Sequence, residues 1–191
     1  MIHDPRQRSF EGFGRPARDM FYFALLPDRA AAVRAGGILQ GIDPAHPRRD
    51  WERLHLTLLY LGRWDGMPRT LERRAAEAAD RLETGRFAVR LDRAGLLGNP
   101  PHRPDLVLRN ADPLGPLLRF RSALAQAAAM SRLGRRSGGF MPHMTLFYGW
   151  TGPFVTRPVE PVEWQARDFV LVRSIVDEGR HEHLARWPLR H

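Results

Sequence analysis

The 191-residue chain contains no cysteine and no lysine, so that all 30 of its basic residues other than histidine are arginines. The lack of cysteine excludes disulfides, cysteine-ligated zinc sites and thiol catalysis. The lack of lysine excludes a P-loop and a lysine-adenylate nucleotidyl transfer, because each of these needs that amine. Two ATP-driven mechanisms are therefore ruled out, while the redox compartment stays open.

A long hydrophobic run is also missing. Residues 1–18 are polar, and the first apolar run, from Met20 to Leu26, is far shorter than the roughly 20 residues that cross a bilayer. We expect residues 1–18 to be a flexible leader and residues 19–191 to form a single domain. We also expect a cytoplasmic protein, monomeric and without a membrane partner.

The charge is strongly one-sided, with a formal net value of +9. An arginine-only basic set has two interpretations, and both stay open. It can reflect the codon composition of the genome. It can also provide a surface for phosphate, since a guanidinium fork pairs with phosphate oxygens.

Hydrophobic patterning predicts an alternation of strands and helices. Strands are predicted at 20–27, 54–61, 86–98, 105–109, 143–149, 168–176 and 183–189, and helices at 28–41, 67–83 and 113–133. Asp28 is a fair N-cap and Gly41 a stop for the first helix, whereas residues 153–161 form a proline-rich link. The order strand, helix, strand occurs twice, which predicts an α+β fold of two similar lobes facing each other.

Two segments repeat the same polar pair inside apolar surroundings: HLTLLYLG begins at His55, and HMTLFYG begins at His143. Because side chains alternate along a strand, each histidine shares a face with the threonine two residues later, Thr57 or Thr145. Strict alternation puts an apolar row on the opposite face of each strand, namely Leu56, Leu58 and Tyr60 in the first and Met144, Leu146 and Tyr148 in the second.

Either histidine alone could be a core residue bonded to a backbone carbonyl. The repetition favours a shared function, in which both pairs line one cleft. Two imidazoles can act as general base and general acid on opposite sides of one phosphorus, and two threonine hydroxyls can hold the non-bridging oxygens. A strained 2′,3′-cyclic ribose phosphate is a substrate that such a site can open without a metal.

The two segments resemble the paired H-x-T/S-x signatures of the two-histidine (2H) phosphoesterase superfamily, and within it the bacterial RNA 2′,3′-cyclic phosphodiesterase branch, also called 2′-5′ RNA ligase. The opening RDMFYFALLPD, the FMP before the second segment and the tail FVLVRSIVDEG are also similar, so the resemblance covers about residues 18 to 189. It implies a bilobal, pseudo-twofold duplicated α+β unit, with antiparallel sheets lining a central cleft and helices packed outside.

The resemblance also implies an activity: opening of RNA terminal 2′,3′-cyclic phosphates to 2′-phosphomonoesters, without metal or nucleotide cofactor. Carried over to this chain, His55 and His143 are the catalytic pair, and Thr57 and Thr145 hold the phosphate. We assign His143 as base and His55 as acid. The substrates are RNA ends or small cyclic nucleotides. A non-catalytic RNA-binding module and 2′-5′ RNA ligation as the physiological direction remain alternatives.

Two positions depart from the branch. Tyr148 stands where members often carry an arginine, and Leu59 where they often carry a charged residue. By alternation Tyr148 lies on the strand face opposite to that of His143. The tyrosine in place of the arginine is therefore not expected to disable the chemistry. Both departures leave the substrate open.

Three further segments are weighed as sites. Arg135 and Arg136, in the basic glycine-rich stretch GRRSGG, could clamp RNA phosphate, and Phe140 could stack on a base, although a solvated loop and core packing are the plainer interpretations. HEH, at 181–183, puts two histidines on one strand face as a possible metal pair. No third ligand is evident, so we assign these histidines to the surface and expect no metal site.

Overall fold

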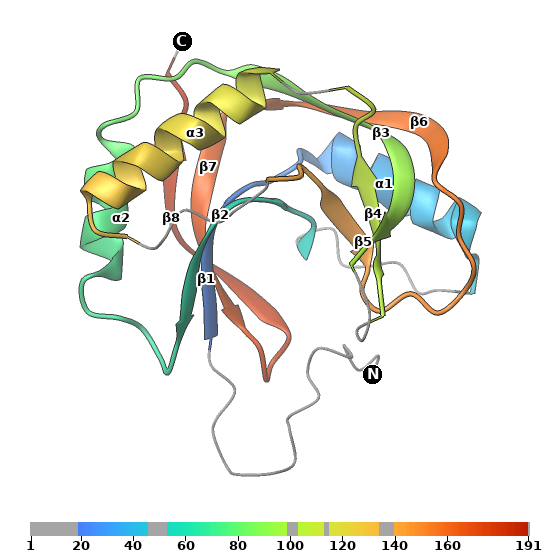
Figure 1. The fold of residues 1–191 in the computed structure, drawn as a ribbon, viewed down its shortest axis with the longest axis horizontal. Helices are drawn as coiled ribbons and strands as arrows, with labels where there is room; N and C mark the ends of the chain where they lie inside the picture. Colours follow the sequence, from blue (N-terminus) through green and yellow to red (C-terminus); the bar gives the residue numbers. More distant parts are fainter. Residues whose placement is uncertain (1–18, 46–52, 99–102, 113–114, 134–139, 191) are drawn as a thin grey trace.

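The computed structural model describes residues 19–45, 53–98, 103–112, 115–133 and 140–190. They form a mixed α+β fold with one eight-stranded antiparallel sheet and three helices (Figure 1). The strands are β1 (Asp19–Leu25), β2 (Leu56–Trp64), β3 (Phe87–Leu97), β4 (Asp105–Arg109), β5 (Met144–Phe147), β6 (Arg157–Ala166), β7 (Asp168–Ile175) and β8 (Arg180–Pro188). The helices are α1 (Arg29–Ile42), α2 (Leu71–Ala79) and α3 (Gly115–Met130). The predicted leader, residues 1–18, lies outside the described residues.

The sheet order is β6-β3-β4-β5-β2-β1-β7-β8. It divides into a first half of β1, β2, β7 and β8 and a second half of β3, β4, β5 and β6. Each half contains a strand, helix, strand unit: β1-α1-β2 in the first and β4-α3-β5 in the second. The two histidine segments lie on β2 and β5, the strands that join the halves. The predicted pseudo-twofold α+β arrangement is confirmed. The sheets predicted for the two halves join through β2 and β5 into one sheet.

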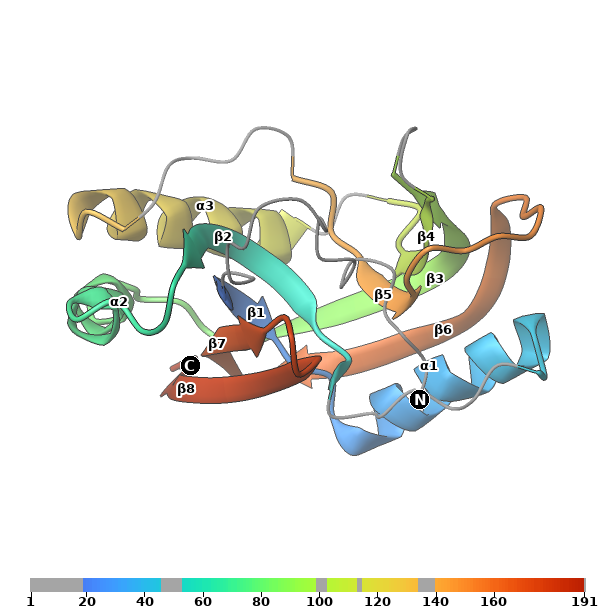
Figure 2. The ribbon, with the colours of Figure 1, turned by 90° about the horizontal axis from the view of Figure 1, so that it is seen from below.

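The helices cross between the halves. Helix α1 leaves β1 of the first half and packs on β5 and β6 of the second. Helix α3 leaves β4 of the second half, and its Phe120 ring lies 5.3 Å from that of Phe169 on β7 of the first half. Figure 2 shows α3 and α1 over opposite ends of the sheet, with α2 beside α3. Helix α1 thus packs on strands of the other half, and α3 packs on strands of both halves, whereas α2 contacts α3 and β8.

Strand alternation separates two apolar clusters. The main core receives one face of β1, through Phe21, Phe23 and Leu25. The opposite face of the same strand carries a smaller cluster, made of Tyr22, Ala24, Val170 and Val172. This second face is the one that carries the polar groups described below.

Most predicted elements occur within a few residues of their expected bounds. The Asp28 side chain caps α1 by accepting from the amide of Ala31 over 2.8 Å, as predicted. Helix α2 is shorter than the predicted 67–83. At its start the amide of Leu71 bonds to the carbonyl of Pro68, and after its end two more bonds of the same short three-residue type tighten the chain.

The sequence pattern does not predict strand β6, because residues 153–161 have the composition of a proline-rich link. It is an edge strand, paired only with β3 among the described strands, so that its two prolines remove no ladder bond that the sheet needs. Pro161 lies within a register irregularity between the pairs formed by Val162 and Pro158. The alternation that buries Val162, Trp164 and Ala166 was present in the sequence but was masked by these prolines.

None of the helices in the described ranges combines the length and the apolar character that a bilayer crossing needs.

Candidate active site

The two histidine segments meet at the centre of the sheet. Leu56 on β2 pairs with Met144 on β5, and both side chains are fully buried in the core. Successive residues of a strand point to opposite faces, so the residues on either side of this pair lie on the face away from the core. The pair is therefore the apolar base beneath the polar residues of both segments.

Extending this antiparallel register by one residue in each direction sets His55 opposite Thr145 and Thr57 opposite His143. All four side chains are half-buried. Directly opposite residues have Cβ atoms about 4.5–5.5 Å apart, and diagonal neighbours lie about 7–8 Å apart. The two imidazoles are therefore diagonal neighbours on this face. The fold thus brings together the four residues selected from the sequence.

Both imidazoles are oriented by the same kind of backbone contact. Nδ1 of His55 donates to the carbonyl of Arg53 over 2.9 Å, and Nδ1 of His143 donates to the carbonyl of Met141 over 2.8 Å. A carbonyl oxygen only accepts, so the proton lies on Nδ1 and the neutral ring carries its lone pair on Nε2. The bond alone would also suit a core histidine. What differs here is that both rings lie on the face away from the core.

A β-bulge follows the threonine in both segments. The extra residue is Leu58 in β2 and Leu146 in β5. A bulge shifts the alternation by one residue. Tyr60 and Tyr148 therefore return to the face of the threonines, and both line the same pocket as His55. The strict alternation assumed from the sequence placed these tyrosines on the opposite face and is wrong there.

The same bulge explains one of the departures from the phosphodiesterase branch. Leu59 follows the extra residue of β2 and lies in the core with only 3% of its surface exposed. A charged side chain would lose its hydration at this position without gaining a partner. An apolar residue is therefore what this chain requires there.

Both segments close on a glycine with positive φ, at 147° for Gly62 and 65° for Gly149. A Cβ atom on Gly62 would lie 2.8 Å from Cη2 of Trp64. The amide of Gly149 donates to a carboxylate oxygen of Asp105 over 3.0 Å. These residues set the path by which each segment leaves the site.

A pocket of about 200 Å³ lies beside His55 and Thr57. All three tyrosines of the chain line it, Tyr148 from the second half of the fold and Tyr22 and Tyr60 from the first. Two arginines, Arg53 and Arg63, also line it, and none of its described lining residues is acidic. This polar and positively charged lining suits an anion.

A third histidine lies in the same pocket, although its sequence context predicts a surface position. The ring of His181 on β8 lies edge-on to that of His55, with the centroids 5.2 Å apart. Tyr22 stacks on His55 at 5.0 Å. His181 reaches the site because β8 pairs with β7, and β7 pairs with β1. The HEH segment was the available signal, but it does not reveal which strands lie beside it.

The remaining predicted residues are placed as follows. Arg135 and Arg136 lie outside the described residues. Phe140 is half-buried against the core, and the guanidinium carbon of Arg121 lies 5.1 Å from the centre of its ring. An RNA contact by Phe140 stays a prediction.

No three histidine, aspartate or glutamate side chains converge as a metal site within the part of the chain that the structure describes. His181 lines the anion pocket instead, together with His55. Independence from metals stays a prediction.

Solved structures share the fold. A phosphoesterase crystal structure aligns over 93% of this chain and 100% of its own, with a TM-score of 0.73 and 24% identity. Escherichia coli LigT complexed with 3′-AMP aligns over 93% and 100%, with a TM-score of 0.73 and 23% identity. TT0787 of Thermus thermophilus aligns over 90% and 98%, with a TM-score of 0.71 and 23% identity. At these identities the likeness shows the fold alone.

A search of curated proteins finds no match. The family model of the 2′-5′ RNA ligase superfamily matches residues 26–178, which include both histidine segments and most of the sheet. Together with the central pairing of β2 and β5, this match establishes that the chain belongs to the 2′-5′ RNA ligase superfamily, the 2H phosphoesterases.

Proposed function

We propose that the protein opens 2′,3′-cyclic phosphates at RNA ends to 2′-phosphomonoesters, with His55 and His143 as general acid and base. Membership in the superfamily supports phosphodiesterase or ligase activity in general. The observation that carries the finer proposal is the matched Nδ1 contact on two histidines placed diagonally across the central strand pair. With Nδ1 bonded to the backbone, the Nε2 atom of each ring is the one left to exchange a proton with a substrate, on the face that carries both threonines.

In the proposed reaction a water oxygen attacks phosphorus in line with the 3′ oxygen. Nε2 of His143 takes the proton of the water as the new P–O bond forms. The bond between phosphorus and the 3′ oxygen breaks, and Nε2–H of His55 protonates the leaving oxygen. The product carries a 2′-phosphate and a 3′-hydroxyl. The hydroxyls of Thr57 and Thr145 donate to the non-bridging oxygens, where charge accumulates in the transition state.

The assignment of His55 as the acid is supported by one contact, the stacking of Tyr22 on its ring, while Arg53, Arg63 and His181 in the same pocket oppose a positive charge there. An acid must carry its proton before the reaction, and a cationic ring is favoured over the face of an aromatic ring within about 6 Å. Tyr22 stacks on His55 at 5.0 Å. No aromatic contact to His143 is found among the described residues.

Nucleotide substrates are supported by the neighbours of the fold. E. coli LigT has been solved with 3′-AMP and with phosphate. In 3′-AMP the phosphate is a monoester on the 3′ oxygen of the ribose, the oxygen that leaves phosphorus in the proposed reaction. The arginines beside His55 would attract that charge to this chain as well.

The test is product analysis on an oligonucleotide that ends in a 2′,3′-cyclic phosphate, in buffer containing EDTA. We expect a 2′-phosphate product from the wild type and a loss of nearly all rate in His55→Ala and His143→Ala. Thr70→Val is the control, because Thr70 is exposed and its side chain makes no cap bond at α2. Near-wild-type rates in both histidine variants would refute the proposal.

Two alternatives are separated in the same assay. If the RNA binds but no product forms on any cyclic phosphate, the protein is a binding module. If a second RNA with a 5′-hydroxyl is added and a 2′-5′ linkage accumulates, that hydroxyl has replaced water as the nucleophile, and the same site catalyses ligation.

A further inference from the structure

A second, larger groove adjoins the histidine pocket. The pocket itself, at about 200 Å³, is smaller than the roughly 300–1,000 Å³ typical of sites for drug-sized ligands. It can hold a terminal cyclic phosphate but leaves no room for the rest of an RNA. The adjoining groove has a volume of about 970 Å³ and shares Arg53, Gly179 and His181 with the pocket. The two spaces therefore adjoin at these three residues.

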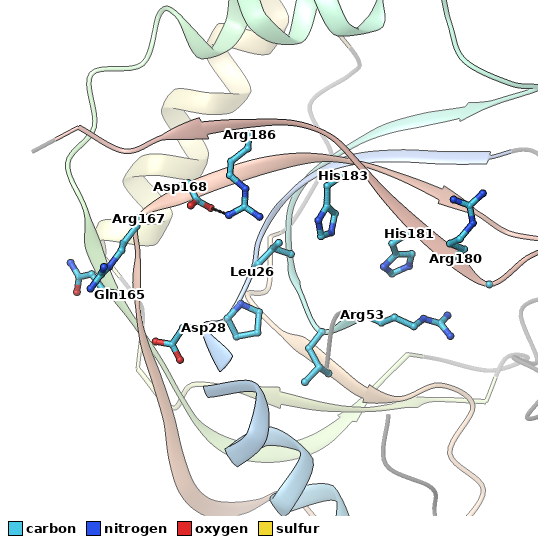
Figure 3. Close-up of a pocket in the computed structure, with 13 residues that line it drawn as sticks. Leu26, Asp28, Arg53, Gln165, Arg167, Asp168, Arg180, His181, His183 and Arg186 are labelled. Carbon is cyan, nitrogen blue, oxygen red and sulfur yellow. Dashed lines mark hydrogen bonds and ion pairs between the residues drawn. The ribbon is translucent and has the colours of Figure 1, made fainter. Parts of the chain in front are cut away.

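The groove runs along β8 towards the junction of β6 and β7. Figure 3 shows Arg53 and His181 at one side, Arg167 at the other, and Leu26 between them. Four arginines and two histidines line it, against two aspartates. This excess of cations continues the positive lining of the histidine pocket.

Some of these charges are already neutralised. Arg186 pairs with Asp168 over 2.9 Å. The guanidinium of Arg180 donates hydrogen bonds to the carboxylates of Glu178 and Glu182, and these bonds raise the pKa of Arg180 above its ordinary value. These arginines are held by the protein and contribute little net charge to the groove.

Arg53 and Arg167 differ from them. Neither has a carboxylate partner within the described ranges. The Nε atom of Arg53 is buried without a hydrogen-bond acceptor. A buried donor without an acceptor is costly unless a ligand or water accepts from it. The two arginines that remain available to an anion thus lie at the two ends of the groove.

We infer that this groove binds the RNA backbone 5′ to the cyclic end, with Arg53 on the phosphodiester nearest the histidine pocket and Arg167 on a more distant one. The inference rests on the proposed function and names its substrate class: oligonucleotides with cyclic ends are preferred over cyclic mononucleotides. Among the described lining residues the only rings are Pro27 and the imidazoles of His181 and His183, and these residues offer no broad stacking platform. Recognition is therefore of phosphate rather than of base sequence.

The test compares kcat/KM on uridine 2′,3′-cyclic phosphate with that on a uridine trinucleotide ending in the same group. The wild type should prefer the trinucleotide. Arg167→Ala should lower that preference roughly ten- to a hundredfold, the range for one hydrogen bond to a charged group. Arg119→Ala, an exposed arginine on α3, removes the same charge elsewhere and should keep the preference.

A binding measurement separates this inference from the proposed reaction. The dissociation constant of a trinucleotide ending in a 2′-phosphate is measured against salt, without turnover. Arg167→Ala should reduce the slope of log K against log salt by about 0.7, the value for one single-strand phosphate contact. Equal wild-type kcat/KM on both substrates would overturn the inference while leaving the reaction intact. Length-dependent, Arg167-dependent binding without turnover would support the groove and refute the reaction.

Discussion

The exit of the first histidine segment offers a sharp test, because a single methyl group at Gly62 meets two separate obstacles. The backbone there has a φ of 147°, a conformation whose cost for an L-residue is of order 1–3 kcal/mol. The added Cβ would also lie 2.8 Å from Cη2 of Trp64, and relieving such overpacking costs about 1–3 kcal/mol. We therefore expect Gly62→Ala to lower the free energy of unfolding by about 2–6 kcal/mol.

Two other glycines supply matched controls for the same change. Gly66 has a φ of 74° and open space around the site of its Cβ, so that Gly66→Ala meets only the left-handed backbone cost of roughly 1–2 kcal/mol. Gly37 lies inside α1 with open space and no positive φ, so that Gly37→Ala should stabilise the protein by about 0.5–1 kcal/mol. Urea unfolding followed by tryptophan fluorescence gives all three values. If Gly62→Ala costs no more than Gly66→Ala, the contact with Trp64 is not limiting and the reasoning is refuted.

Further predictions concern the site. Thr57→Val should lower kcat roughly 10²- to 10³-fold, as loss of one transition-state donor does, and a loss no larger than that of Thr70→Val would exclude the phosphate role. The pH profile of kcat/KM should be bell-shaped, rising with pH as the base loses its proton and falling as the acid loses its own. His143→Ala should abolish the rising limb of the residual activity. If the rising limb persists in this variant, the roles of His143 as base and His55 as acid are reversed. His181→Gln removes a ring 5.2 Å from that of His55, and a protonated neighbour disfavours a second charge; the falling limb should move to higher pH, and an unmoved limb would show that His181 acts only by packing.

The repeated segments made the central pairing of the sheet predictable. A histidine and a threonine two residues apart on one strand face need hydrogen-bond partners or solvent. Two such pairs can share one polar site when their strands are neighbours. The faces of the residues that follow were not predictable. An extra residue at Leu58 or Leu146 changes the register with the neighbouring strand but leaves no mark in the local pattern of apolar residues.

The site was only partly predictable for a related reason. His181 belongs to a strand whose place in the sheet depends on pairing with β7, and β7 lies beside β1 from the opposite end of the chain. Sequence spacing carries no information on such a long-range neighbour. Strand β6 was unpredictable for a similar reason. A proline such as Pro161 is tolerated in a strand at the edge of a sheet, and edge position is a property of the whole sheet.

The crossing of α1 and α3 has a consequence for how the chain can be divided. A fragment ending before β3 would contain α1 without β5 and β6, the strands on which it packs, and would also lack β7 and β8. The complementary fragment would lose the covering of the same two strands. Neither piece could bury its own apolar surface, so cooperative unfolding of the whole molecule, rather than stepwise loss of one half, follows from this interlocking.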